Sequence, residues 1–207
     1  MDLEWLANTK RLKAIADSGR HFARDPFDIE RYTEISQIAI AMMARLADAP
    51  VAEIEGLLAS SSEGYATPKI DVRGALIREG RILLVREHRD GVWSLPGGFA
   101  DVGLSAAQNI RKEFLEEAGL SVEVLQLYAL RHKAQNPYDS DLFDYYKLFF
   151  LCEAGDDQIP STGLETTSVG FFTPDALPPL SHKRVLESDI KAAFACSADP
   201  GRAPLFD

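Results

Sequence analysis

The sequence predicts an α/β fold preceded by a small all-helical domain. Residues 1–66 carry apolar side chains at helical spacing, broken only by short turns that contain Asp and Pro. From Lys69 onward, short runs of β-branched and aromatic residues separated by turns are typical of strands. One helix interrupts these strands and another follows them, an alternation that favours a sheet covered by helices. We therefore expect a helical domain at 1–66 and an α/β domain at 67–207.

Three helices are expected in the first domain. Gly19 is placed to stop the first helix, and Asp28 is placed to cap the second. A serine-rich stretch at 60–64 reads as a linker. Helices of this length bury little surface alone, so we expect them to pack on the rest of the chain, on a second subunit, or on both. The expected helices are Leu3–Ser18, Ile29–Ala47 and Val51–Ala59.

The second domain is expected to contain six strands and two helices. A hairpin turn at Arg78–Arg81 joins the first two strands, and a polar loop at Gln135–Asp144 separates two longer ones. The final helix is expected at about Lys183–Ala195. The expected strands are Ile70–Ile77, Ile82–Arg86, Val92–Leu95, Val122–Arg131, Tyr145–Glu153 and Val169–Phe172.

The remaining helix lies in the most informative stretch, Gly97 to Leu120. A Pro-Gly-Gly turn at Pro96–Gly98 precedes it, and Ser105 stands where a helix N-cap belongs. Ala106–Ala118 contains no Gly or Pro, and Gly119 occupies the position of a C-terminal cap. The side expected to be buried consists of Ala106, Ile110, Phe114 and Ala118.

Three carboxylates lie on one face of this helix. Glu113, Glu116 and Glu117 have the spacing i, i+3, i+4, which makes their side chains neighbours. They repel one another, and the negative end of the helix dipole adds to the cost. A hard divalent cation would explain the arrangement, because Mg²⁺ binds protein carboxylates together with substrate phosphates. A solvated acidic face is the alternative explanation.

The stretch resembles the Nudix box, Gly-x5-Glu-x7-Arg-Glu-apolar-x-Glu-Glu-x-Gly-apolar, of hydrolases that split nucleoside diphosphates linked to another moiety. Two positions depart from this pattern. Leu104 replaces a glutamate, and Lys112 replaces an arginine, which keeps the positive charge but loses the bidentate fork. The positions that match are Gly98, Glu113, Phe114, Glu116, Glu117, Gly119 and Leu120.

The N-terminal residues resemble the helical extension of one Nudix branch. The similarity involves Trp5, the Arg11–Ile15 region and Asp25–Tyr32. Members of this branch are described as ADP-ribose or CDP-choline pyrophosphatases. The resemblance implies an α/β/α sandwich with a mixed sheet, and a homodimer with the helical segment in its interface.

The resemblance also implies the chemistry: hydrolysis of a diphosphate linkage to two monophosphates with Mg²⁺ or Mn²⁺. Glu113 and Glu117 are the expected principal metal ligands, with Glu116 as a third and the Gly98 carbonyl as a backbone ligand. Nudix enzymes take their general base from a loop outside the box or from the box itself. Glu165 is the candidate outside the box, and Glu116 is a candidate within it.

Substrate phosphates need positive partners, and three arginines are candidates. Arg73 and Arg86 are expected on strands that precede the box, and Arg131 at the end of the strand that follows it. Each has an alternative role in a surface salt bridge.

Composition restricts the function further. The net charge of −10 argues against binding to nucleic-acid polymers or to an anionic membrane surface. Cys152 and Cys196 form neither a metal pattern nor a disulfide framework. There is no apolar run of 18 residues and no basic–apolar leader. These observations predict a cytoplasmic protein.

Two other functions are compatible with the sequence. A pyrophosphatase acting on nucleoside triphosphates would release inorganic pyrophosphate instead of two monophosphates. A catalytically silent Nudix-fold module that binds nucleotides or regulates a partner is favoured by the departures at Leu104 and Lys112. The intact helix carboxylates favour the enzyme over this module.

Overall fold

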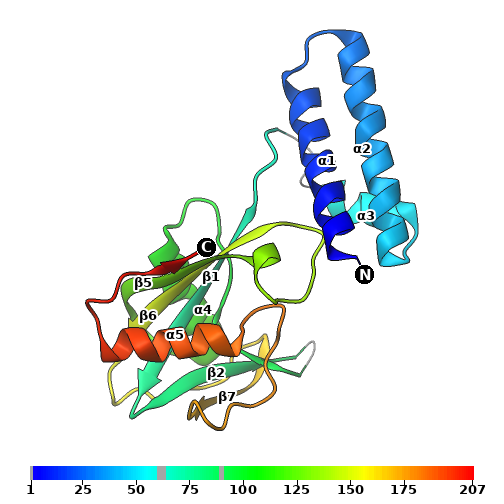
Figure 1. Ribbon diagram of the computed structural model, residues 1–207. Helices are drawn as coiled ribbons and strands as arrows, with labels where there is room; N and C mark the ends of the chain where they lie inside the picture. Colours follow the sequence, from blue (N-terminus) through cyan, green and yellow to red (C-terminus); the bar gives the residue numbers. More distant parts are fainter. Residues whose placement is uncertain (1, 60–63, 89–90) are drawn as a thin grey trace. The chain divides into compact units, whose positions relative to one another are not determined.

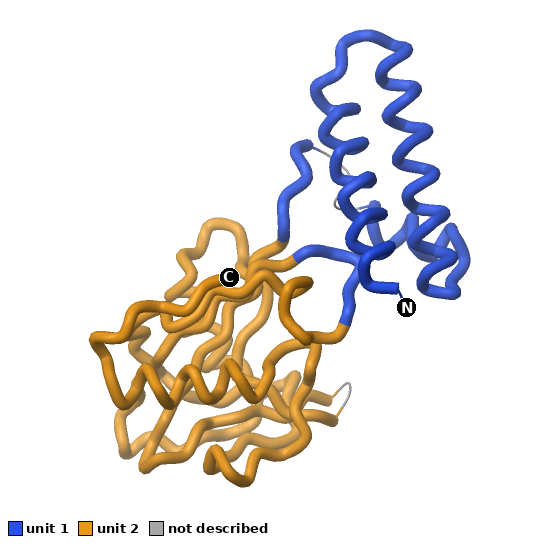
Figure 2. The backbone as a smooth tube through the Cα atoms, in the orientation of Figure 1, with its two compact units in different colours: residues 1–68, 140–144 blue, residues 69–139, 145–207 orange. Residues whose placement is uncertain are grey.

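The computed structural model describes residues 2–59, 64–88 and 91–207, which form two compact units (Figure 2). The first unit comprises Met1–Pro68 and Ser140–Asp144, and the second comprises Lys69–Asp139 and Tyr145–Asp207. The expected α/β fold with a helical N-terminal region is confirmed. Most of the expected linker, residues 60–63, lies outside the described residues.

The first unit contains α1 (Leu3–Phe22), α2 (Pro26–Ala47) and α3 (Val51–Leu58). Contrary to expectation, α1 continues through Gly19. A Cβ there would overlap the Tyr32 ring, so this glycine permits close packing of α1 on α2. The cap of α2 is Asp25 instead of Asp28, because Asp25 Oδ1 accepts a hydrogen bond from the Phe27 N–H at 2.8 Å.

Part of the expected polar loop belongs to the first unit. Leu142 and Phe143 pack against the small core formed by α2 and α3. On α1, Lys10 Nζ donates to the Phe143 carbonyl at 3.0 Å and pairs with Asp144 at 2.5 Å. These contacts explain why residues 140–144 group with the helices.

Several large apolar side chains on the helices are exposed, including Trp5 on α1 and Ile38 on α2. In the described part of the chain, no single helix is long and apolar enough to cross a membrane. Helices α2 and α3 are long and apolar enough only when they are counted together, and the chain bends by 115° between them.

The second unit is built on a mixed sheet with the strand order β3-β2-β1-β6-β5-β8. Two further strands leave this path: β4 pairs with β1, and β7 pairs with β2. The β1–β6 and β5–β8 pairs are parallel and the other pairs antiparallel, so the expected mixed sheet is confirmed. The strands are β1 (Lys69–Arg78), β2 (Arg81–Glu87), β3 (Trp93–Ser94), β4 (Gly97–Phe99), β5 (Glu123–His132), β6 (Tyr145–Glu153), β7 (Thr166–Phe172) and β8 (Leu205–Phe206).

Helices cover both faces of this sheet (Figure 1). The expected helix in the box is present as α4 (Ala106–Ala118), and its Ile110 and Phe114 are fully buried against Val72 and Leu83 of the sheet. On the other face, α5 (Glu187–Ala198) buries Ile190 among residues of a second core cluster. The final helix begins four residues later than expected. Residues 181–186 instead form a hydrogen-bonded turn.

β1 has two partners along one edge, and this arrangement shapes the site. Its first half pairs with β4 through Asp71–Arg73, and its last residues pair with β2 through Ile77 and Arg78. β6 lies along the opposite edge. The two antiparallel partners therefore separate beside the middle of β1, where the Leu95–Gly97 segment lies.

Candidate active site

The Pro96–Gly98 turn, whose two glycines the structure places at the start of β4 and not in a free turn as expected, is fixed from two sides. Pro96 accepts a hydrogen bond from the Gly74 N–H at 2.9 Å, and the Gly97 N–H donates to Glu117 Oε2 at 2.9 Å. Gly97 has a φ of 143°, and a Cβ there would overlap the Val72 carbonyl. Only glycine therefore fits this position. The turn is thus hydrogen-bonded both to β1 and to Glu117 in the C-terminal part of α4.

The sequence of α4 places the carboxylates beside this turn. Ser105 and Gln108 form a capping box at its start, and Gly119 ends it with a φ of 65°. Glu117 is only 5% exposed, whereas Glu116 is exposed. Glu113 lies against Gly98: a Cβ on Gly98 would be 2.8 Å from Glu113 Oε1. The structure thus brings the Gly98 backbone and the predicted principal ligands together.

Burial disfavours the ionised form of two of these carboxylates, Glu113 and Glu117, and so raises their pKa values. It raises the pKa of Glu117 to about 7, although Arg73 and the Gly97 N–H act in the opposite direction. Burial also raises the pKa of Glu113, and the charges of Glu116 and Glu165 add to this rise. A divalent cation would relieve both penalties, and carboxylate oxygens are the ligands that Mg²⁺ prefers. By their chemistry these residues therefore fit a hard divalent cation.

The side chains are not yet gathered around a cation position. Glu117 is turned to the Gly97 N–H, and Glu116 lies 3.6 Å from Lys112 Nζ. Within residues 2–59, 64–88 and 91–207, no three Asp, Glu, His or Cys side chains are close enough to hold a metal ion. The predicted ligands Glu113, Glu116, Glu117 and Gly98 therefore remain a prediction.

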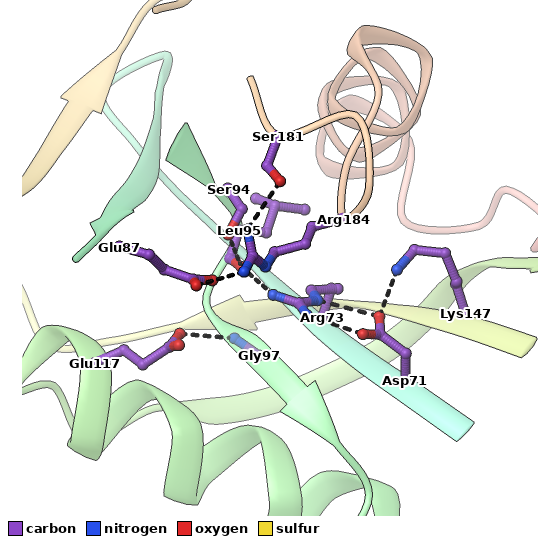
Figure 3. A network of polar contacts seen from close by, with 10 residues as sticks. All are labelled: Asp71, Arg73, Glu87, Ser94, Leu95, Gly97, Glu117, Lys147, Ser181 and Arg184. Atoms are coloured by element: carbon purple, nitrogen blue, oxygen red, sulfur yellow. Dashed lines mark hydrogen bonds and ion pairs between the residues drawn. The ribbon is translucent and has the colours of Figure 1, made fainter. Parts of the chain in front are cut away.

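Arg73 lies at the centre of a buried polar network (Figure 3). It is 4% exposed, and it binds both carboxylate oxygens of Asp71 through Nε at 3.1 Å and Nη2 at 2.8 Å. Its Nη1 donates to the Leu95 carbonyl at 3.2 Å, next to the Pro96–Gly98 turn. The guanidinium is thus directed at Asp71 and at the chain that carries the turn, which is the geometry of a residue that positions the site.

Lys147 of β6 completes this network, with Nζ 2.7 Å from Asp71 Oδ1. Burial lowers the pKa of Lys147 to about 8, with Asp71 opposing the shift and Arg73 adding to it. Burial alone would raise the pKa of Asp71, but Arg73 and Lys147 outweigh it and lower that pKa. Asp71 therefore stays ionised between two buried cations.

Lys112, the departure from the box arginine, has a loop partner. Its Nζ lies 2.8 Å from Asp101 Oδ2, and this hydrogen bond raises the pKa of Lys112. Asp101 is held in turn because its N–H donates to Asn109 Oδ1 at 2.9 Å. A carboxylate three residues before Leu104 thus ties the box loop to α4. The box pattern did not indicate this pair, since Asp101 occupies one of its unspecified positions between Gly98 and Leu104.

The loop that carries Glu165 is attached to α4. Thr166 Oγ1 accepts from the Gly163 N–H at 2.9 Å and donates to the Glu117 carbonyl at 2.8 Å. A Cβ on Gly163 would overlap the Glu116 carbonyl, so the loop lies directly on the last turn of the helix. Glu165 is exposed and is near enough to raise the pKa of Glu113. Its role as general base stays a prediction.

The hydrogen-bond and ion-pair partners of the other two predicted substrate contacts, Arg86 and Arg131, belong to segments other than α4. Arg86 is exposed, and its Nε donates to the Gly91 carbonyl at 2.6 Å. Arg131 pairs with Asp207 at 3.2 Å and lies 4.0 Å from Asp189 of α5. Arg73, Arg86 and Arg131 thus each have a different partner, and their contacts with substrate remain predictions.

Sequence reasoning missed two charged residues beside the turn, Glu87 and Arg184. Glu87 lies at the end of β2, and its negative charge acts to raise the pKa values of both Arg73 and Glu117. Arg184 Nη2 donates to Glu87 Oε2 at 2.5 Å, across 97 positions of sequence. No local pattern indicates a contact over such a separation. The hydrogen-bonded turn that carries Arg184 was expected to be helix.

The fold and the box define this chain as a Nudix hydrolase. Residues 68–192 match the sequence model of the NUDIX domain, which is more than half of the 207 residues, so the chain belongs to this family. Residues 3–58 match the UDP-X-like N-terminal oligomerisation domain. The expected membership of a Nudix branch with a helical extension, and the expected pyrophosphatase class, are confirmed.

Three relatives illustrate the similarity, and two of them span almost the whole chain. YjhB of Bacillus subtilis (strain 168), named as a candidate ADP-ribose pyrophosphatase, is 41% identical over 204 residues, covering 99% of this chain and 97% of that protein. The crystal structure of an ADP-ribose pyrophosphatase from Streptococcus suis 89-1591 has a TM-score of 0.62 and 38% identity, covering 68% of this chain and 100% of that one. A UDP-X diphosphatase structure has a TM-score of 0.62 and 33% identity, covering 100% of both chains.

Proposed function

We propose that this Nudix pyrophosphatase hydrolyses the diphosphate linkage of a nucleoside diphosphate derivative to two monophosphates. ADP-ribose is the leading substrate, and the name of the B. subtilis relative supports it. CDP-choline is the second candidate. The observation that carries the proposal is that Glu113 and Glu117 of α4 contact the Pro96–Gly98 turn, with Glu117 buried and hydrogen-bonded to the Gly97 N–H.

We propose Mg²⁺ or Mn²⁺ as the cofactor, with Glu113 and Glu117 as principal ligands and Glu116 and the Gly98 carbonyl as further ligands. Such a cation neutralises phosphate charge and lowers the pKa of the attacking water. The chain's own contribution is to fix the ligands in place. The capping box starts α4 and the Gly97 N–H holds Glu117 beside the Pro96–Gly98 turn, so the helix that carries the ligands is already in place and only their side chains would have to reorient.

The general base is proposed to be Glu165, with Glu116 as the alternative. Both side chains are exposed, and both raise the pKa of Glu113 by their charge. Glu165 has the better support, because the Thr166 hydroxyl ties its loop to the Glu117 carbonyl. A base on this loop would move together with the helix that carries the ligands.

The helical region at 1–66 is proposed to join two copies of the chain into a homodimer, and 67–207 to form the catalytic domain. The match of residues 3–58 to an oligomerisation domain supports self-association. Exposed apolar side chains on α1 and α2 offer a surface for it. A cytoplasmic location remains part of this proposal.

The test is a hydrolysis screen of the full chain with Mg²⁺ and with Mn²⁺. The panel contains ADP-ribose, CDP-choline, nucleoside diphosphate sugars, dinucleotides and nucleoside triphosphates, with products identified by mass spectrometry. Two monophosphates from a diphosphate-linked substrate are expected. Inorganic pyrophosphate from a triphosphate would instead identify a pyrophosphatase that acts on nucleoside triphosphates.

A silent nucleotide-binding module is the alternative function, favoured by the departures at Leu104 and Lys112. It predicts tight nucleotide binding without turnover for any member of the panel. The enzyme predicts that Glu117→Gln lowers metal-dependent turnover by about a hundredfold or more, since one principal ligand loses its charge. Unchanged turnover in that variant would contradict the ligand assignment.

A further inference from the structure

Arg184 is a partly buried arginine beside the Pro96–Gly98 turn. It precedes α5, and its Nη1 donates to Ser181 Oγ at 2.9 Å while its Nη2 donates to Glu87 Oε2 at 2.5 Å. The side chains of Arg184 and Glu87 are 21% and 17% exposed. The ion pair is thus neither fully solvated nor sealed in the core, and both side chains keep some contact with solvent.

The turn that carries Arg184 is held at a fixed place. The Ser181 N–H donates to the Trp93 carbonyl at 2.8 Å, and the Trp93 N–H donates to the Pro179 carbonyl at 3.0 Å. This segment therefore lies beside β3, which leads directly into Leu95 and the Pro96–Gly98 turn. Figure 3 shows Arg184 and Arg73 reaching toward the same space near Leu95, with Glu87 and Glu117 approaching from β2 and α4.

Arg73 and Arg184 differ in the carboxylates that their guanidinium groups bind. Arg73 is buried, and its fork binds Asp71, which Lys147 also holds. Arg184 instead pairs with Glu87, whose negative charge also acts on Glu117. A carboxylate and a phosphate offer a guanidinium the same edge of two oxygens, so one can replace the other.

We propose that Arg184 binds the substrate diphosphate, and that Glu87 occupies its guanidinium in the free enzyme as an internal anion that the diphosphate displaces. This inference rests on the proposed function, because it assigns the diphosphate to the site beside α4. Removal of either residue then has opposite effects on diphosphate binding. Loss of Arg184 removes a contact, whereas loss of the Glu87 charge removes a competitor.

The experiment is isothermal titration of the full chain with inorganic pyrophosphate, with and without Mg²⁺. We expect Arg184→Gln to weaken binding roughly ten- to a hundredfold, the range of a lost charge-assisted hydrogen bond. Arg184→Lys keeps the charge but not the fork, so an intermediate loss is expected. Glu87→Gln is expected to tighten binding roughly threefold or more, with and without Mg²⁺.

The matched control is the Arg81–Glu79 pair in the turn between β1 and β2, where Nη2 and Oε2 are 2.6 Å apart. Arg81→Gln and Glu79→Gln should leave pyrophosphate binding unchanged. Thermal unfolding of every variant separates an effect on binding from a loss of folded protein. A merely structural Arg184–Glu87 pair predicts that both variants lose stability and affinity together.

Weaker binding by Glu87→Gln would overturn the inference, because Glu87 would then support the anion or its cation. Unchanged binding by Arg184→Gln, or no binding of pyrophosphate by the unmodified chain, would overturn it as well. The proposed function fails on a different result, namely the absence of nucleoside diphosphate hydrolysis in the substrate screen. Opposite shifts in pyrophosphate affinity would still support the Arg184 assignment in that case.

Discussion

At the residue scale, the buried position of Glu117 beside the Pro96–Gly98 turn lowers the stability of the folded protein when its carboxylate is ionised. Its folded pKa of about 7 lies above the 4.5 of an ordinary glutamate, so the folded metal-free protein binds the proton more tightly than the unfolded chain. Stability from this group is present below pH 4.5 and is lost as the pH rises to about 7. We therefore expect Glu117→Gln to stabilise the metal-free protein at pH 8 by about 1–3 kcal/mol.

Thermal unfolding in a chelator at pH 5 and pH 8 measures this effect. Glu117→Gln should gain more at pH 8 than at pH 5, because glutamine never ionises. The exposed Glu116→Gln serves as the control and should show little change at either pH. Equal gains for the two variants would show that burial of the Glu117 charge costs nothing.

Asp71 is the second residue with a predictable effect. Asp71→Asn would leave Arg73 and Lys147 buried without their shared carboxylate, which costs about 3–5 kcal/mol in comparable buried pairs. A fall in the denaturation midpoint is the expected result. Asp156→Asn is the control, since that side chain is 98% exposed and lies 3.8 Å from Arg78. A midpoint for Asp71→Asn that matches the control would contradict the role of the network.

The pH dependence of Lys147 provides a separate check. Its folded pKa of about 8 lies below the ordinary value of 10.5, so the unfolded chain binds this proton more readily between these values. Stability of the protein should therefore rise with pH from about 8 to 10.5 through this group. Lys147→Met should flatten that part of the stability profile, measured by urea unfolding at several pH values.

The site was predictable from sequence only where residues are near one another along the chain. Glu113, Glu116 and Glu117 were found because helical spacing alone places them on one face. The pairing of Arg184 with Glu87 was not, because it depends on how two distant turns fold onto the sheet. The expected phosphate contact of Arg73 stays a prediction, and the partner that its fork binds, Asp71 two residues before it on β1, was not indicated by the sequence pattern.

At the scale of elements, the contact between α4 and the Gly163–Thr166 loop is the most sensitive junction. Gly163→Ala places a Cβ on the Glu116 carbonyl, so the loop must move away from the helix. Because Glu165 lies on that loop, we expect kcat to fall roughly ten- to a hundredfold. Steady-state hydrolysis of the substrate found in the screen measures this change.

Gly56→Ala is the matched control for that substitution. Nothing lies within 4 Å of a Cβ at this position of α3, and alanine favours a helix over glycine by about 0.5–1 kcal/mol. The variant should keep its activity and unfold at a slightly higher temperature. A loss of activity in Gly56→Ala equal to that of Gly163→Ala would contradict the importance of the contact between the Gly163–Thr166 loop and α4 for turnover.

Element boundaries followed the sequence less closely than element types. Gly19 was expected to end α1, yet the helix continues because this glycine packs against Tyr32. The short strands β4 and β8 escaped notice, since two or three residues carry too little periodicity to identify a strand. Tertiary contacts determine where α1 ends and where β4 and β8 form, and these contacts cannot be predicted from local composition.

At the scale of the whole molecule, self-association is expected to depend on the exposed apolar face of α2. Ile38 is 52% exposed, and Ser36 and Ala39 on either side of it are buried within the unit. Ile38→Glu would place a charge in the proposed interface, and we expect the dissociation constant of the dimer to rise roughly a hundredfold. Light scattering coupled to size exclusion measures this shift.

Gln37→Glu introduces the same charge one position earlier and serves as the control. It should leave the dimer intact, because it points to a different side of α2. A dimer that survives Ile38→Glu would place the interface on another surface. The fold class itself was predictable from sequence, because the change from helical to strand periodicity at Lys69 coincides with the start of β1.

β1 is shared by two antiparallel partners and a parallel one, and this has a consequence for how such chains diverge. An insertion or deletion between Asp71 and Ile77 would turn one group of side chains toward the wrong helix and break the alignment with β4, β2 or β6. Homologues should therefore keep the length of this segment unchanged, while gaps gather in exposed connections such as that around Asp156 and Asp157. An alignment of many family members would reveal β1 as an ungapped block.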